Sequence, residues 1–170
     1  MKVLVAVDEK EFACAITEFI VSQGWPQNTQ FTILSVIEPL KVGNLMAVLP
    51  GPILDEIVED HFDSAKVLVK ATASAIRQHC PDSEILEEII EGFAKEEIIR
   101  YAEEQKANLI IVGSHGRSGF QRMILGSVSL AVVSHAPCSV VVVRLPNAAQ
   151  DDSTHDESRS ENKADVAMKS

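Results

Sequence analysis

Hydrophobic positions follow two alternating patterns along the first 145 residues of the chain. Continuous apolar runs, such as Val3 to Val7, are typical of strands covered on both faces of a parallel sheet. Apolar residues spaced by three and four, such as Phe12, Ile16 and Ile20, are typical of amphipathic helices. The predicted strands are 3–7, 31–37, 85–90, 109–112 and 139–143, and the predicted helices are 11–24, 54–76, 94–102 and 128–134. This alternation predicts an α/β fold with an open, doubly wound, five-stranded parallel sheet and helices on both faces.

The pattern ends at Leu145. Residues 146–170 are rich in Asp, Ser, Asn, Glu and Lys and contain few large apolar side chains. Such a segment cannot bury enough surface to offset the entropy lost on ordering. A length of 170 residues suits a single folded domain. We therefore predict a folded domain at 1–145 and a disordered acidic tail at 146–170.

Composition narrows the range of partners. The net charge of −10 argues against a nucleic acid as the main partner, because phosphate backbones need clustered positive charge. The chain has no run of about 18 uninterrupted apolar residues that could span a membrane. Cys14, Cys80 and Cys138 are too widely spaced to suggest a disulfide framework or a zinc site. We expect a cytoplasmic protein that binds neither nucleic acid nor membrane.

A glycine signature carries the candidate chemistry. Gly113-x2-Gly116-x9-Gly126-Ser127 directly follows the predicted strand 109–112, and the carboxyl end of a strand is where open α/β sheets bind ligands. Glycines let backbone amides come close to an anion, and Gly126-Ser127 immediately precedes a predicted helix whose first amides can join them. The Walker A pattern and the dinucleotide fingerprint are both absent from the sequence. A phosphate site of another type is therefore predicted.

With this signature the chain resembles the universal stress protein family, in particular its ATP-binding subgroup, whose signature is Gly-x2-Gly-x9-Gly-Ser/Thr. The resemblance covers about residues 1–145. It implies a strand order of 3-2-1-4-5, in which the first and fourth strands meet where the winding reverses. Asp8 and the glycine loop would face each other across that crevice. The implied ligand is ATP, with Mg²⁺ as a plausible bridging cation.

The roles known in the family, carried over by position, imply ten ligand-binding residues. Asp8 would contact the adenosine, Val36 would pack against the base, and Val112 and Gly113 would line the pocket. The phosphate side would comprise His115, Gly116, Arg117, Gly126, Ser127 and Val128.

Some residues allow a second interpretation. Asp8 could cap the first helix, and the glycines could serve only tight turns. Ser114, Ser118, Ser127 and Ser129 could be phosphorylation sites or ordinary loop residues. The chain also departs from the family, whose members often carry Asp-Gly-Ser where this sequence has Asp8-Glu9-Lys10. Glu9 and Glu11 would repel phosphates unless a cation screens or bridges the charges.

The site contains no recognisable nucleophile and base, so we expect binding rather than rapid turnover. The favoured function is an ATP-binding regulatory stress-response protein that acts as a homodimer. Its apolar edge strand 139–143 would be covered by the same strand of a second copy. One alternative is a slow Mg²⁺-dependent ATPase or autophosphorylating enzyme that uses His115 or Ser127. Another is an interaction module that binds no nucleotide.

Overall fold

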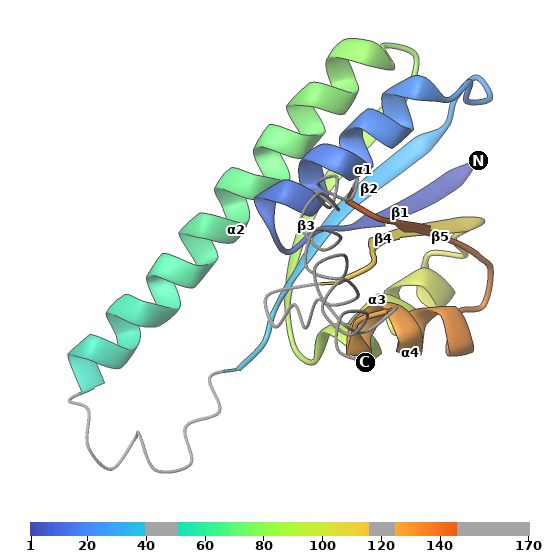
Figure 1. Ribbon diagram of the computed structural model, residues 1–170. Helices are drawn as coiled ribbons and strands as arrows, with labels where there is room; N and C mark the ends of the chain where they lie inside the picture. Colours follow the sequence, from blue (N-terminus) through green and yellow to red (C-terminus); the bar gives the residue numbers. More distant parts are fainter. Residues whose placement is uncertain (40–50, 116–124, 146–170) are drawn as a thin grey trace, which may run out of the picture.

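The computed structural model describes residues 1–39, 51–115 and 125–145. Gly116, Arg117, Ser118 and the predicted tail 146–170 lie outside the described residues. Nine helices and strands alternate along this part of the chain (Figure 1). They are β1 (Lys2–Ala6), α1 (Lys10–Ser22), β2 (Gln30–Ile37), α2 (Gly51–His79), β3 (Glu84–Glu91), α3 (Ala94–Glu104), β4 (Leu109–Gly113), α4 (Ser127–His135) and β5 (Ser139–Val143).

The five strands form one sheet of order β3-β2-β1-β4-β5, and each neighbouring pair is parallel. The predicted fold class and strand order are therefore confirmed. β1 lies at the centre, where Val5 is paired with Ile33 of β2 on one side and with Ile111 of β4 on the other. The winding reverses between β1 and β4, so this pair forms the switch point at which such sheets bind ligands.

Helices cover both faces of the sheet, with α1 and α2 along one face and α3 and α4 along the other (Figure 1). Val3 and Val5 belong to the core cluster on the α1 and α2 side, whereas Leu4 belongs to the cluster on the α3 and α4 side. Successive residues of a strand point to opposite faces, so β1 is apolar from Val3 onwards, where both faces are covered. This double burial explains why the central strands β1 and β4 are continuous hydrophobic runs, whereas the edge strand β3 contains four glutamates.

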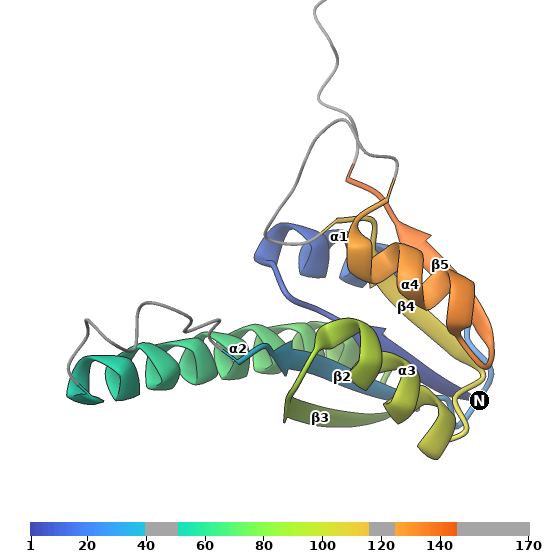
Figure 2. The same cartoon turned by 90° about the horizontal axis from the view of Figure 1, so that it is seen from below.

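Helix α2 is longer than its hydrophobic pattern predicts. It begins at Gly51 rather than at residue 54, with Pro52 in its first turn. Proline is compatible with that position, because the first amides of a helix have no partner within the helix. The N-terminal half of α2 extends past the strands (Figure 2). Packing against the sheet is concentrated in its C-terminal half, where Val69, Ala73 and Ile76 are buried.

Candidate functional site

Ser114 joins the end of β4 to the start of α4. Its backbone N–H donates to Val143 O at 2.7 Å, which ties it to the end of β5. Its carbonyl oxygen accepts a hydrogen bond from the backbone N–H of Gly126, also at 2.7 Å. The two halves of the glycine signature, 113–115 and 126–127, therefore lie side by side at the carboxyl edge of the sheet.

Ser129 reinforces this junction. Its Oγ lies 2.9 Å from Ser114 O and 3.0 Å from Gly126 O, and the side chain is buried in the first turn of α4. Ser114 is 4% exposed and Ser129 is 3% exposed. Both were candidates for phosphorylation, but neither hydroxyl is accessible to another protein in this structure. Their role here is structural, within the loop itself.

Gly126 lies where two backbone segments approach closely. A Cβ at this position would lie 3.2 Å from His115 Cα and 3.3 Å from Ser114 O. Its φ of −71° is one that any residue adopts. Gly126 therefore supplies space between two backbone segments rather than an unusual backbone conformation.

Gly113 provides space for a side chain. A Cβ at Gly113 would lie 2.8 Å from Cδ1 and 2.9 Å from Cγ of Phe12, which is buried in the first turn of α1. The glycine thus lets the Phe12 ring pack over the last residue of β4. Among the described glycines, only Gly92 has a positive φ, so Gly113 is not required by a left-handed turn either.

The N-terminus of α4 is suited to an anion. Its N-cap is Gly126, and its first turn contains no acidic residue. Ser127 is exposed and Val128 is half-buried at this end of the helix. The first amides of a helix have no intrahelical acceptor, and the helix dipole places partial positive charge on them. Phosphate oxygens are the kind of group that these amides bind.

Asp8 follows β1 at the same edge of the sheet. Ala6 is paired with Val112, and Asp8 and Ser114 each come two residues later. The side chain of Asp8 is exposed, as a ligand contact requires. The alternative that Asp8 is the N-cap of α1 is wrong, because Glu9 occupies that position. The predicted arrangement of Asp8 across the switch point from the glycine loop is consistent with this register.

His115 is half-buried, and its Nδ1 lies 3.1 Å from Ser114 Oγ. When the Ser114 hydroxyl donates to Nδ1, the neutral imidazole carries its hydrogen on Nε2. That hydrogen can be donated to an anion. The Ser114 hydroxyl can equally accept a hydrogen bond from Nδ1–H, so the contact joins the two side chains without assigning the His115 tautomer.

The valines predicted for the site are part of the core. Val112 is 3% exposed and belongs to the core cluster on the α3 and α4 side, with β1 and β5 paired on either side of it. Val36 and Val128 are half-buried and pack against the cluster that contains Val112. Sequence reasoning did not identify Phe12, and it assigned Ser129 a different role. The contacts of both residues depend on tertiary packing that leaves no local signal in the sequence.

Other kinds of site find little support in the described part of the chain. Within it, no three His, Cys, Asp or Glu side chains gather as a metal site would require. All three cysteines are free, and burial raises the pKa of the Cys80 and Cys138 thiols, which disfavours the reactive thiolate. No helix within these residues is long and apolar enough to cross a membrane.

Comparison with known sequences identifies the class of protein. Residues 1–144 match the sequence profile of the universal stress protein family, and the chain therefore belongs to that family. Universal stress protein YxiE of Bacillus subtilis is 30% identical over 148 residues, which cover 84% of this chain and 98% of that protein. Universal stress protein MJ0531 of Methanocaldococcus jannaschii is 44% identical over 59 residues, a match that spans 35% of each chain.

Solved structures share the fold. Protein MJ0577 of Methanocaldococcus jannaschii superposes with a TM-score of 0.72 and 23% identity, covering 86% of this chain and 96% of that one. A family member from Arabidopsis thaliana with AMP bound has a TM-score of 0.61 and 14% identity, with coverage of 86% and 93%. A universal stress protein in complex with cAMP has a TM-score of 0.58 and 18% identity, with coverage of 86% and 98%.

Proposed function

We propose that this protein binds ATP at the switch point between β1 and β4 and acts as a cytoplasmic, nucleotide-dependent regulatory protein. The observation that carries this proposal is the junction of the two halves of the glycine signature. There the Ser114 carbonyl holds Gly126 at 2.7 Å beside a helix N-terminus whose first turn has no acid. Relatives of the same fold with bound AMP or cAMP support an adenine nucleotide as the ligand.

The residues at this edge fit a nucleotide with a divalent cation. The amides at the start of α4 suit the phosphates, and exposed Asp8 suits the ribose hydroxyls, for which a carboxylate is a good acceptor. Glu9 at the N-cap of α1 and Glu11 in its first turn add negative charge. Mg²⁺ bound to the phosphates would reduce the repulsion between these carboxylates and the ligand.

We also propose that the protein is a homodimer that pairs through β5. In the described sheet β5 is an edge strand that pairs with β4 alone, and its sequence is Ser139 followed by four valines. An apolar edge of this kind is a hazard unless another strand covers it. An antiparallel pair of β5 strands across a twofold axis would satisfy both edges at once.

The test begins with freshly purified full-length protein, which is denatured so that released nucleotides can be identified by mass spectrometry. The emptied protein is then titrated with ATP and Mg²⁺ in a calorimeter. We expect micromolar binding that Gly126→Val reduces by at least about tenfold, equivalent to about 1.4 kcal/mol. Gly24→Val is the matched control, because a Cβ at Gly24 meets no atom within 4 Å. Absence of both nucleotide and binding heat would reject the nucleotide site.

Slow hydrolysis is a second candidate function, favoured by the contact between His115 Nδ1 and Ser114 Oγ. A histidine whose ring is held by a neighbouring hydroxyl can act as an acid or a base. Release of ADP by the parent protein and by His115→Ala distinguishes the two functions. Turnover that is lost in the variant while ATP affinity persists would indicate catalysis, whereas equal rates would leave binding as the function.

A further inference from the structure

The Ser114 carbonyl, Gly126 and the Ser129 hydroxyl form a small network that we call the β4–α4 clasp. The carbonyl accepts one hydrogen bond from Gly126 N and lies within hydrogen-bond distance of Ser129 Oγ. A serine hydroxyl has one hydrogen, so Ser129 shares it between the Ser114 and Gly126 carbonyl oxygens. The clasp thus links residues 15 positions apart, on either side of the glycine loop.

We propose that Ser129 is a positioning residue for the nucleotide site. Its buried hydroxyl holds the Ser114 carbonyl against the start of α4 and so fixes the path by which the chain enters the glycine loop. This inference rests on the proposed function, because the consequence of the clasp is measured as nucleotide affinity. It gives Ser129 a role that requires no contact with the ligand.

The geometry of the peptide explains how the hydroxyl acts at a distance. The peptide between Ser114 and His115 is trans, so the His115 N–H points opposite to the Ser114 carbonyl. Fixing the carbonyl therefore fixes the direction of the first amide of the loop. The Ser114 N–H is held in turn by Val143 O, so this residue is anchored on both of its peptide units.

Removal of the hydroxyl should change the loop more than the fold. In Ser129→Ala the Ser114 carbonyl would keep its bond from Gly126 N, and the Gly126 carbonyl would keep its bond from Leu130 N at 2.9 Å. Neither buried acceptor is left without a donor, so the large cost of an unsatisfied carbonyl does not arise. The variant loses the hydrogen bond from Ser129 Oγ to Ser114 O and keeps the one from Gly126 N to Ser114 O. These are the two bonds that hold Ser114 against the start of α4.

The test compares three variants of the full chain. Ser129→Ala removes the hydroxyl, whereas Ser129→Thr keeps it. Ser134→Ala is the matched control, because Ser134 lies on the same helix and its exposed hydroxyl donates to Leu130 O at 2.8 Å, away from the clasp. In titrations with ATP and Mg²⁺ we expect Ser129→Ala to bind about threefold to tenfold more weakly than the parent, the range that one hydrogen bond supplies. The other two variants should bind like the parent.

Amide hydrogen exchange provides a readout that does not depend on the ligand. We expect the Gly126 amide to exchange about threefold to tenfold faster in Ser129→Ala. The Val7 amide, which donates to Leu34 O at 2.9 Å in the sheet, should keep its parental rate. Equal acceleration of both amides would mean general destabilisation and would contradict the positioning role.

The outcomes separate this inference from the proposed function. If the parent binds ATP and Ser129→Ala binds it equally well, the positioning role is wrong. If the parent binds no ATP, the proposed function fails. The hydrogen-exchange measurement then tests only whether the Ser129 hydroxyl holds Gly126 and Ser114 together. Selective acceleration at Gly126 would support the clasp, and an unchanged Gly126 rate would overturn it.

Discussion

The N-termini of α3 and α4 lie at the same edge of the sheet, since each helix follows a parallel strand, yet their electrostatics are opposite. At α3, Ala94 N donates to Glu38 Oε1 at 3.3 Å, and two glutamates occupy the first turn. At α4 the N-cap is a glycine and the first turn has no acid. The positive end of the α3 dipole is satisfied by carboxylates of the protein itself, whereas that of α4 is suited to an external anion.

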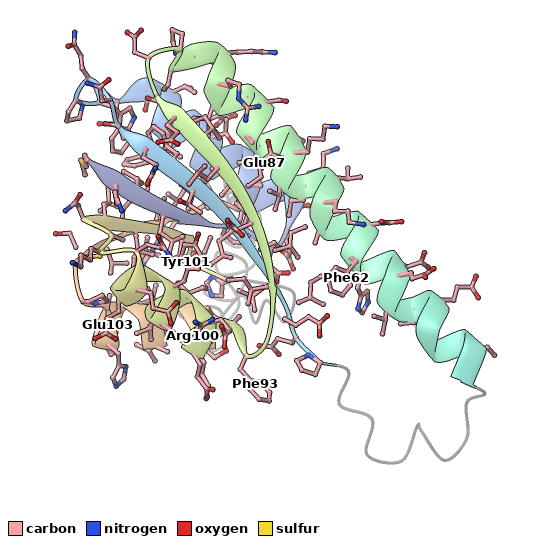
Figure 3. All side chains as sticks on the ribbon, turned by 180° about the vertical axis from the view of Figure 1, so that it is seen from behind. Phe62, Glu87, Phe93, Arg100, Tyr101 and Glu103 are labelled. Carbon is pink, nitrogen blue, oxygen red and sulfur yellow. The ribbon has the colours of Figure 1, made fainter. Side chains whose placement is uncertain are left out.

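The glycines that precede the two helices differ in the same way. Gly92, before α3, has a φ of +152°, and a Cβ there would lie 2.6 Å from Glu97 Cγ. Glu97 also forms an ion pair with Arg100, one turn further along α3. Figure 3 labels Arg100 on this helix. Gly126 has an ordinary φ and is crowded by backbone instead. The two glycines thus meet different requirements. Gly92 allows a positive φ and leaves room for the Glu97 side chain at the start of α3, whereas Gly126 lets two backbone segments of the candidate site come close together.

The largest expected contrast comes from Gly92→Ala and Gly126→Ala. Gly92→Ala should lower the free energy of unfolding by about 1–3 kcal/mol through backbone strain, with ATP affinity unchanged. Gly126→Ala should weaken ATP binding about tenfold, because the start of α4 and the end of β4 must separate. Urea unfolding and calorimetric titration of both variants measure the two effects. A similar loss of ATP affinity in both variants would contradict the proposal that the N-terminus of α4, and not that of α3, binds the phosphates.

A substitution at Gly113 sharpens the contrast between crowding by backbone and crowding by a side chain. Gly113→Ala should destabilise the protein by about 1–3 kcal/mol, because its Cβ would overlap the Phe12 ring. The double variant with Phe12→Leu should regain part of that loss, whereas Phe12→Leu should not rescue Gly126→Ala. Urea unfolding of the single and double variants completes the cycle. Strict additivity of the Gly113 and Phe12 effects would contradict the contact.

Adding an acid to α4 should make it resemble α3. Ser127→Asp places a carboxylate in the first turn, where it should strengthen the helix but compete with phosphate. We expect ATP binding to weaken by about tenfold, equivalent to about 1.4 kcal/mol, at low salt. Ser134→Asp adds the same charge near the other end of α4 and should leave affinity nearly unchanged. If the two variants were equally weak, net charge rather than the helix N-terminus would explain the loss.

The smallest effect is expected at Glu38. Glu38→Gln removes the negative charge beside Ala94 N and should lower the free energy of unfolding by about 0.3–1 kcal/mol. ATP affinity should stay the same, because this carboxylate lies at the N-terminus of α3 rather than at that of α4. Urea unfolding at low and high salt measures the change, which should shrink as salt screens the dipole. A clear gain in ATP affinity would place Glu38 near the ligand instead.

Much of the fold followed from the sequence alone. Continuous apolar runs and helical spacing predicted five strands and four helices in the observed order, with ends that differ by at most a few residues. The strand order came from the family resemblance and is confirmed. Helix α2 was the main departure at an end, since Gly51 and Pro52 were expected to precede it. Those two residues are poor helix formers in general, but the first turn tolerates them.

Only part of the candidate site could be predicted from the sequence. Sequence determined that three glycines and a serine follow a buried strand at a family spacing, because local order and hydrophobic periodicity are properties of the chain itself. Tertiary structure decided why the glycines are needed. It brings Phe12 against Gly113, and Ser129 against Ser114, across separations that no local pattern records. Such contacts depend on how α1 and α4 pack against β4, so they become visible only when the whole sheet is assembled.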